Sequence, residues 1–122
     1  MRDERGSVSI VATGLMVLTV VLAMGGADVA KALIAQARAQ TAADAGALAA
    51  AQELALPSGL VPGDLAADYA GRNDAALVSC TCEPGTTEAV VEVQVPVGTL
   101  LLFADDRIVT GRARAVVDLA GG

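Results

Sequence analysis

A long uncharged stretch dominates the first part of the chain. No Asp, Glu, Lys or Arg occurs from Gly6 to Ala27, and Arg5 and Asp28 bound the run. Its 22 residues extend about 33 Å as an α-helix, enough to cross a hydrocarbon core of about 30 Å. The pattern therefore predicts one membrane-spanning helix.

An alanine-rich segment follows the span without a break and continues to Leu56, where Pro57 is expected to end the helix. Small residues recur at every fourth position in a ridge: Ala35, Ala39, Ala43, Ala47 and Ala51. A second row beside it contains Ala42, Gly46 and Ala50. Such rows let another backbone approach closely. We expect the ridge to pack against copies or relatives of this helix; the alternatives are that the rest of the chain folds back on it, or that a biased genome enriches alanine.

The segment from Leu56 to Gly63 contains two prolines and two glycines, which predicts a turn or loop. Asp64 is then expected to cap a short helix that ends near Arg72.

From Ala75 onward the apolar residues recur at every second position, which predicts strands over 75–82, 87–97 and 108–119. In the middle strand, one face carries Val91, Val93, Val95 and Val97. The inward face of the last strand is small: Val109, Gly111, Ala113, Ala115 and Val117. Such a face suits a helix lying close against the sheet, and Glu83 to Thr86 is expected to form a hairpin turn.

The connection between the second and third strands contains the apolar patch Thr99 to Phe103. Two interpretations compete: an extra helical turn that plugs the sheet, and an exposed contact for a partner. We favour the plug.

Composition argues against several classes of function. The net charge is −6 and aromatic residues make up 2% of the chain, so neither phosphate neutralisation nor base stacking is expected, and nucleic-acid binding is excluded. Without histidine, acid–base catalysis would fall to carboxylates such as Asp105 and Asp106, which are more simply a solvated turn. We expect no enzyme, no cofactor, no metal site and no small-molecule substrate.

Cys80 and Cys82 are the two cysteines of the chain. In a regular strand their Cα atoms would lie about 6 to 7 Å apart, at the outer edge of what a disulfide spans, so a bond needs a bulge or turn. A local disulfide, an intermolecular disulfide and two reduced thiols remain open; we favour a disulfide of either kind.

The orientation of the span follows from the charges that flank it. Arg2 and Arg5 precede it, while Lys31 and Arg38 follow it, and the free amino terminus adds one positive charge to the first side. We expect a single-pass protein of the cytoplasmic membrane with its amino terminus inside. The expected division is 1–6 as a cytoplasmic stub or leader, 7–56 as the spanning and extended helix, 57–63 as a linker, and 64–122 as a small extracytoplasmic α/β part.

The first 55 or so residues resemble the TadE/TadG-like family of tight-adherence (Flp) pilus-assembly proteins. The resemblance rests on Arg5 and Gly6 before the span, Asp28 after it, and the alanine-rich block Ala42 to Ala51 at a fixed distance behind. The chain most resembles short TadE-like members found beside helicase and secretion genes in actinobacteria. The resemblance implies an α+β, pilin-like fold: one long helix, a short helix and a small three-stranded antiparallel sheet. It implies membrane lipid and other pilin-like or Tad subunits as partners.

Related pilins are cut after a glycine by a prepilin peptidase, and the resemblance makes Gly6 and Ser7 the candidate cleavage site. The fifth residue of the cut chain would be Val11, where pilins usually carry a glutamate. Val11 cannot pair with a neighbouring amino terminus, so the resemblance supports an assembly role more than processing or polymerisation.

Two function classes remain. The first is a pseudopilin-like or minor-pilin-like component, or an assembly factor, of a Flp-type pilus or related secretion system. The alternative is a small secreted binding domain whose signal peptide ends near Ala27, after Gly25 and Gly26. The charge-balanced start and the continuing helix count against the alternative.

Overall fold

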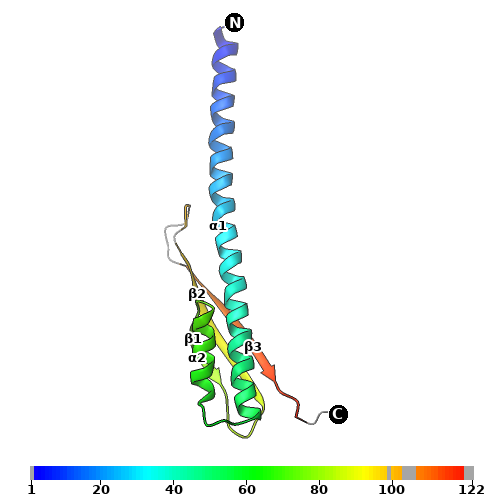
Figure 1. Ribbon diagram of the computed structural model, residues 1–122. Helices are drawn as coiled ribbons and strands as arrows, with labels where there is room; N and C mark the ends of the chain where they lie inside the picture. Colours follow the sequence, from blue (N-terminus) through cyan, green and yellow to red (C-terminus); the bar gives the residue numbers. More distant parts are fainter. Residues whose placement is uncertain (1, 99, 103–106, 120–122) are drawn as a thin grey trace.

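The computed structural model describes residues 2–98, 100–102 and 107–119. Two helices precede three strands along the chain (Figure 1). The elements are α1 (Arg2–Ala55), α2 (Pro62–Arg72), β1 (Ala76–Thr81), β2 (Glu88–Gly98) and β3 (Arg107–Val116). The expected α+β, pilin-like architecture of one long helix, one short helix and a three-stranded antiparallel sheet is confirmed.

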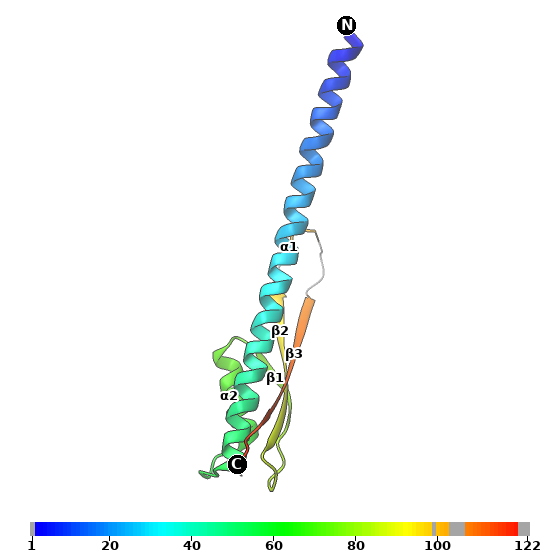
Figure 2. The same ribbon diagram turned by 90° about the vertical axis from the view of Figure 1, so that its right-hand side faces the viewer.

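Helix α1 contains 54 residues and is about 81 Å long at the usual helical rise. Its amino-terminal part projects away from the other elements, and its carboxy-terminal part lies among them (Figures 1 and 2). It already includes Arg2 to Gly6, so the residues expected as a stub are helical. It ends one residue before Leu56, where the approaching Pro57 disfavours helical backbone.

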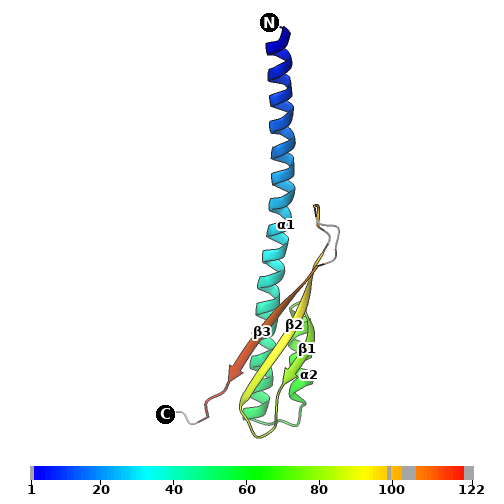
Figure 3. The ribbon, with the colours of Figure 1, turned by 180° about the vertical axis from the view of Figure 1, so that it is seen from behind.

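The three strands form one antiparallel sheet in the order β1-β2-β3, and α1 and α2 pack side by side on the same face of it (Figures 2 and 3). The layer between helices and sheet is built from small side chains. Val91 and Val93 are the largest side chains that are completely buried among the described residues. Most of the remaining core is alanine.

Helix α2 begins at Pro62, two residues before the predicted start. Val61 is the residue at its amino-terminal cap, and no side chain caps the first turn. The expectation that Asp64 is the cap is therefore wrong: Asp64 lies inside the first turn, where a proline already supplies the fixed φ that a helix start needs. There its carboxylate interacts favourably with the helix dipole.

The predicted hairpin between β1 and β2 is confirmed. The backbone N–H of Thr86 donates to the carbonyl oxygen of Glu83 over 3.3 Å. Gly85 adopts a φ of 92°, a left-handed conformation that the third position of a type II turn requires, and Pro84 precedes it.

The alternation predicted for β2 and β3 is also present. Val91, Val93 and Val95 are buried, Val97 is half-buried, and Gly111 and Ala113 of β3 are buried against the helices. Strand β3 ends at Val116 rather than at Leu119. Val117 adds one further backbone bond, from its N–H to the carbonyl oxygen of Thr87, before the pairing stops.

Strand β3 crosses α1 with almost no side chain between the two backbones. A Cβ atom placed on Gly111 would collide with the carbonyl group of Ala39 and would lie 2.9 Å from the backbone nitrogen of Gln40. Only glycine fits this crossing. The close contact explains why the inward face of β3 is small.

Two glutamines of α1 cover the outer edge of β3. Gln36 Nε2 donates to the carbonyl oxygen of Thr110 over 3.3 Å, and Gln40 Nε2 donates to that of Arg112 over 3.1 Å. Because β3 is an edge strand, these alternate carbonyl groups face away from β2. The helix thereby satisfies an edge that would otherwise be open to pairing with another chain.

The turn after α1 is held by the buried side chain of Glu53. Its Oε1 accepts the backbone N–H groups of Ser58 (2.8 Å) and Leu60 (2.9 Å), and its Oε2 accepts the Ser58 hydroxyl (2.7 Å). The Ser58 hydroxyl, followed by the Ser58 backbone N–H, lowers the pKa of the Glu53 carboxyl below its ordinary value, against the opposing effect of desolvation. The ionised carboxylate thus fixes the reversal of the chain.

We expect Gly111→Ala to destabilise the full chain by about 2–3 kcal/mol, because α1 and β3 must separate to admit one methyl group. Thermal unfolding in detergent micelles, followed by circular dichroism, measures the effect. Gly71→Ala is the matched control: a Cβ atom on Gly71 has nothing within 4 Å, and alanine in a helix favours stability by up to about 1 kcal/mol. Equal stability of the two variants would contradict the close crossing.

We expect the Glu53→Gln variant to lose less stability than the wild type as the pH is lowered. Because the pKa of Glu53 is lower in the folded chain than in the unfolded chain, its stabilising effect is present above the ordinary pKa and disappears as the pH falls through the folded-state value. Unfolding midpoints measured between about pH 6 and pH 3 test this. Glu83→Gln, which removes one exposed carboxylate from the same end of the molecule, is the control; parallel profiles for wild type and Glu53→Gln would argue against the clamp.

Candidate functional site

The amino-terminal part of α1 carries apolar side chains on every side of the helix. All residues from Gly6 to Ala23 are exposed. The large members of this surface are Val8, Ile10, Val11, Leu15, Met16, Val17, Leu18, Val20, Val21 and Leu22. The helix is long and apolar enough to cross a membrane, and none of its most apolar window is buried by the rest of the described chain. An apolar surface of this extent indicates membrane anchoring.

Two threonine hydroxyl groups in this part of α1 bond to the helix itself. Thr13 Oγ1 donates to the carbonyl oxygen of Ser9, and Thr19 Oγ1 donates to that of Leu15, both over 2.8 Å. A hydroxyl group bonded in this way can lie in hydrocarbon at little cost. The two threonines are therefore compatible with the span.

The predicted cleavage site lies within the first turns of α1. Gly6 and Ser7 both have helical backbone, and Val11 is exposed on the apolar surface. A peptidase would need to unwind the end of the helix, which is where helices open most easily. Cleavage after Gly6 stays a prediction.

The alanine ridge is occupied by the chain's own fold. Its five members are almost completely buried, with exposed fractions of 4% for Ala35 and 0% for Ala39, Ala43, Ala47 and Ala51. In the second row, a Cβ atom on Gly46 would lie 3.1 Å from the carbonyl oxygen of Ala66 in α2. The structure thus has the folded-back arrangement, and a contact with another subunit would have to use a different face of α1.

Leu101 and Leu102 do not form the expected plug. They form a bend without helical backbone, and they are 53% and 44% exposed. The expectation of a helical turn filling the sheet is wrong for these two residues, because the Leu102 side chain lies against Gly25 of α1. Thr99 and Phe103, the ends of the patch, lie outside the described residues, as do Asp105 and Asp106.

The carboxylate of Asp28 attaches Leu101 and Leu102 to α1. Asp28 Oδ1 accepts the backbone N–H of Leu101 and Asp28 Oδ2 accepts that of Leu102, each over 2.7 Å. Asp28 is 2% exposed. The sequence marked Asp28 as a boundary of the span and as one of the residues that carry the family resemblance, but did not predict its partners. One feature of the sequence could have indicated this role: Asp28 lies seven residues before Ala35 and therefore on the same face of α1 as the alanine ridge. A charged side chain buried on that face requires hydrogen-bond partners.

Beyond the span, the face of α1 that points away from the sheet is also apolar. Val29, Leu33 and Ile34 are each more than half exposed. They lie on the side of the helix opposite Asp28 and Ala35. This outward face is the part of the extended helix that remains available to another protein.

The two cysteines are close enough for a local disulfide. Their Cα atoms are 5.5 Å apart, nearer than in a regular strand, and their sulfur atoms are within bonding distance. The register of β1 against β2 shifts between Leu77 and Ser79, and β1 ends at Thr81, before Cys82. Because β1 ends before Cys82, the two cysteines can approach more closely than they would within a regular strand. We therefore propose the local disulfide.

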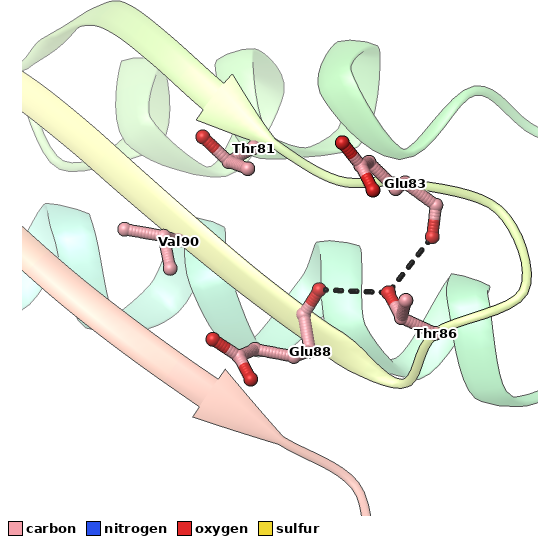
Figure 4. A pocket seen from close by; sticks show the side chains of 5 residues that line it. All are labelled: Thr81, Glu83, Thr86, Glu88 and Val90. Atoms are coloured by element: carbon pink, nitrogen blue, oxygen red, sulfur yellow. Dashed lines mark hydrogen bonds between the residues drawn. The ribbon is translucent and has the colours of Figure 1, made fainter.

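A shallow hollow of about 260 Å³ lies beside the hairpin turn (Figure 4). It is lined by Thr81, Glu83, Thr86, Glu88 and Val90. Two of its polar side chains bond within the chain: Thr86 Oγ1 donates to the carbonyl oxygen of Glu83 over 2.8 Å, and Glu88 Oε1 pairs with Arg114 Nε over 2.8 Å. We assign no ligand to this hollow.

The described residues offer no evident catalytic centre. The Ser58 hydroxyl donates to the Glu53 carboxylate as part of a turn, and the lowered pKa of Glu53 makes this carboxylate a weak base for activating it. Among the residues that the structure describes, no three His, Cys, Asp or Glu side chains come together as metal ligands. The interfaces of α1 are therefore the candidate site.

Comparison with known families gives one match. The family model for the Tad family, described as Flp pilus-assembly TadE/G-like, matches residues 6–53. The match covers the apolar span and the alanine ridge, so the resemblance seen in the sequence is confirmed for that segment. Proteins of this kind are generally non-enzymatic. No curated protein and no solved structure matches the chain.

The proposed disulfide predicts that neither cysteine of the purified, oxidised chain reacts with iodoacetamide until a reductant is added. Under denaturing conditions without reductant, mass spectrometry should find no alkylated chain and no disulfide-linked dimer. Alkylation of both thiols before reduction would indicate reduced cysteines, and a linked dimer would indicate the intermolecular alternative.

Proposed function

We propose, because residues 6–53 match the family model for TadE/G-like proteins of Flp pilus assembly, that this chain is a non-enzymatic, single-span component of a Flp-type pilus or a related secretion system. Its role is that of a pseudopilin-like or minor-pilin-like subunit, or of an assembly factor. The lipid bilayer is one partner, and other Tad subunits are the second.

The observation that carries this proposal is the division of α1 into two parts with different surroundings. From Gly6 to Ala23 the helix is exposed and apolar all round, whereas from Ala35 to Ala51 one face is buried under the sheet and α2. One continuous helix therefore joins a membrane anchor to a folded domain. This design suits a protein that holds a small domain at a membrane surface.

We propose that the amino terminus faces the cytoplasm and that the domain after Pro57 is extracytoplasmic. Arg2, Arg5 and the amino terminus precede the span and carry three positive charges, whereas Lys31 and Arg38 after it carry two, so the positive-inside rule favours this orientation by one charge. The spacing of Cys80 and Cys82 also supports it, because a disulfide persists in an oxidising compartment.

The outward face of α1 is the proposed contact for other Tad subunits. Val29, Leu33 and Ile34 are exposed beyond the end of the span, and the small ridge on the opposite side is already covered. An exposed apolar stripe on an extended helix is suited to packing against another helix.

We propose further that the span is retained in the mature protein. The alternative cleavage near Ala27 would fall inside α1, which continues without a break from the span to Ala55, next to the buried Asp28. Retention is compatible with either fate of Gly6, since cleavage there would remove only the first six residues.

Purification from native membranes tests this proposal. We expect the chain to resist extraction at alkaline pH and to show an intact mass that includes residues 7–27, starting at Met1 or at Ser7. A photo-crosslinking residue at Leu33 should join the chain to another Tad subunit, whereas the same residue at the exposed Leu60 should not. A mature chain starting at Asp28 would overturn the proposal in favour of a secreted domain.

A further inference from the structure

We propose that Leu101 and Leu102, which lie between β2 and β3, form a second membrane contact, in which their side chains rest in the interfacial layer of the bilayer and Asp28 holds them there. The inference rests on the proposed function, because it requires α1 to be inserted in the membrane. It adds a lipid-binding surface to the folded domain itself.

The first argument is the position of the connection along α1. A Cβ atom on Gly25 would lie 3.4 Å from Leu102 Cδ1, and Gly25 belongs to the last turn of the uncharged run that ends at Ala27. Figures 1 and 2 show a short coloured segment after β2 beside α1, on the side of the sheet that faces the projecting part of the helix. Leu102 thus lies at the level where the helix leaves the hydrocarbon core.

The second argument is the exposure of the two leucines. About half of each side chain is uncovered by the described chain. An apolar side chain gains free energy when its surface leaves water for an apolar layer, so lipid would stabilise the uncovered parts of both leucines. Because the leucines continue the apolar surface of α1, the occupant that the geometry supports is lipid.

The third argument is that the backbone N–H groups of Leu101 and Leu102 have hydrogen-bond acceptors within the chain. Peptide N–H groups near hydrocarbon require internal partners, since water is scarce there. The two N–H groups that follow each other at Leu101 and Leu102 both donate to the carboxylate of Asp28, and this carboxylate is itself almost completely shielded. Asp28 therefore allows a non-helical segment to approach the membrane, and it fixes the height of that segment on α1.

Two attachments would restrict the motion of the domain. A single helix permits rotation about its axis and changes of tilt, whereas a second contact beside it makes one side of the domain face the bilayer. The outward face around Leu33 would then be presented in a defined direction along the membrane.

Tryptophan fluorescence tests the proposal directly, because the chain contains no tryptophan. Single variants Leu101→Trp and Leu102→Trp are reconstituted in phosphatidylcholine vesicles whose acyl chains carry bromine at a shallow or a deep position. We expect a blue-shifted emission and stronger quenching by the shallow bromine. Met16→Trp, in the middle of the span, should be quenched by the deep bromine. Leu60→Trp, exposed at the far end of the domain, should be quenched by neither.

The two controls separate the possible failures. Absence of quenching for Met16→Trp would overturn the anchoring itself. Quenching of Met16→Trp together with an unquenched, red-shifted emission at positions 101 and 102 would overturn the lipid contact alone, and would leave water or a protein partner as the surroundings of the connection.

The role of Asp28 is tested in the Leu102→Trp background. We expect Asp28→Ala to abolish most of the shallow quenching, because two N–H groups lose their acceptor and the connection leaves α1. Asp44→Ala removes an exposed carboxylate from the same helix and should leave the quenching unchanged. Equal quenching with and without Asp28 would show that this carboxylate does not position the leucines.

Discussion

The closeness of α1 to β3 is the constraint on which the rest of this structure depends. At Gly111 and Ala39 the two backbones meet without an intervening side chain. A core formed in this way cannot contain large residues, and the described one is made of alanine, glycine and valine. Its cohesion comes from many short contacts between backbone and methyl groups, which individually contribute little and depend on close fit.

The same helix performs three tasks that separate elements often perform. Its first part supplies the anchor, its alanine ridge and the second row beside it supply half of the buried core cluster, and Gln36 and Gln40 cover the free edge of β3. Asp28 adds a fourth, since it attaches the connection between β2 and β3. Because the residues that perform these four tasks all belong to one continuous helix, the domain has a fixed position relative to the end of the span.

The sequence was sufficient for those features that depend on local periodicity. The long helix, the alternation of Val91, Val93 and Val95, and the small inward face of β3 each follow from spacing within one element. The partner of the alanine ridge could not be derived, since small residues permit either a neighbouring helix or the chain's own sheet. Asp28 and Glu53 were missed because their roles depend on hydrogen bonds to backbone groups, up to 74 positions away for Asp28. The exposed Leu101 and Leu102 were misassigned because hydropathy measures apolar character and not the direction in which a loop extends.

The crossing of α1 and β3 also has a consequence for the order of events during synthesis. Gln40 and the Arg112 carbonyl that it contacts are 72 positions apart, so the helix emerges and enters the membrane well before its covering strand has been made. Throughout that interval the alanine ridge around Ala39 and Ala43 is not covered by the sheet. The nascent chain therefore passes through a stage in which its anchor is inserted while its core is still exposed, and the core is buried once β3 has been synthesised and packs against α1.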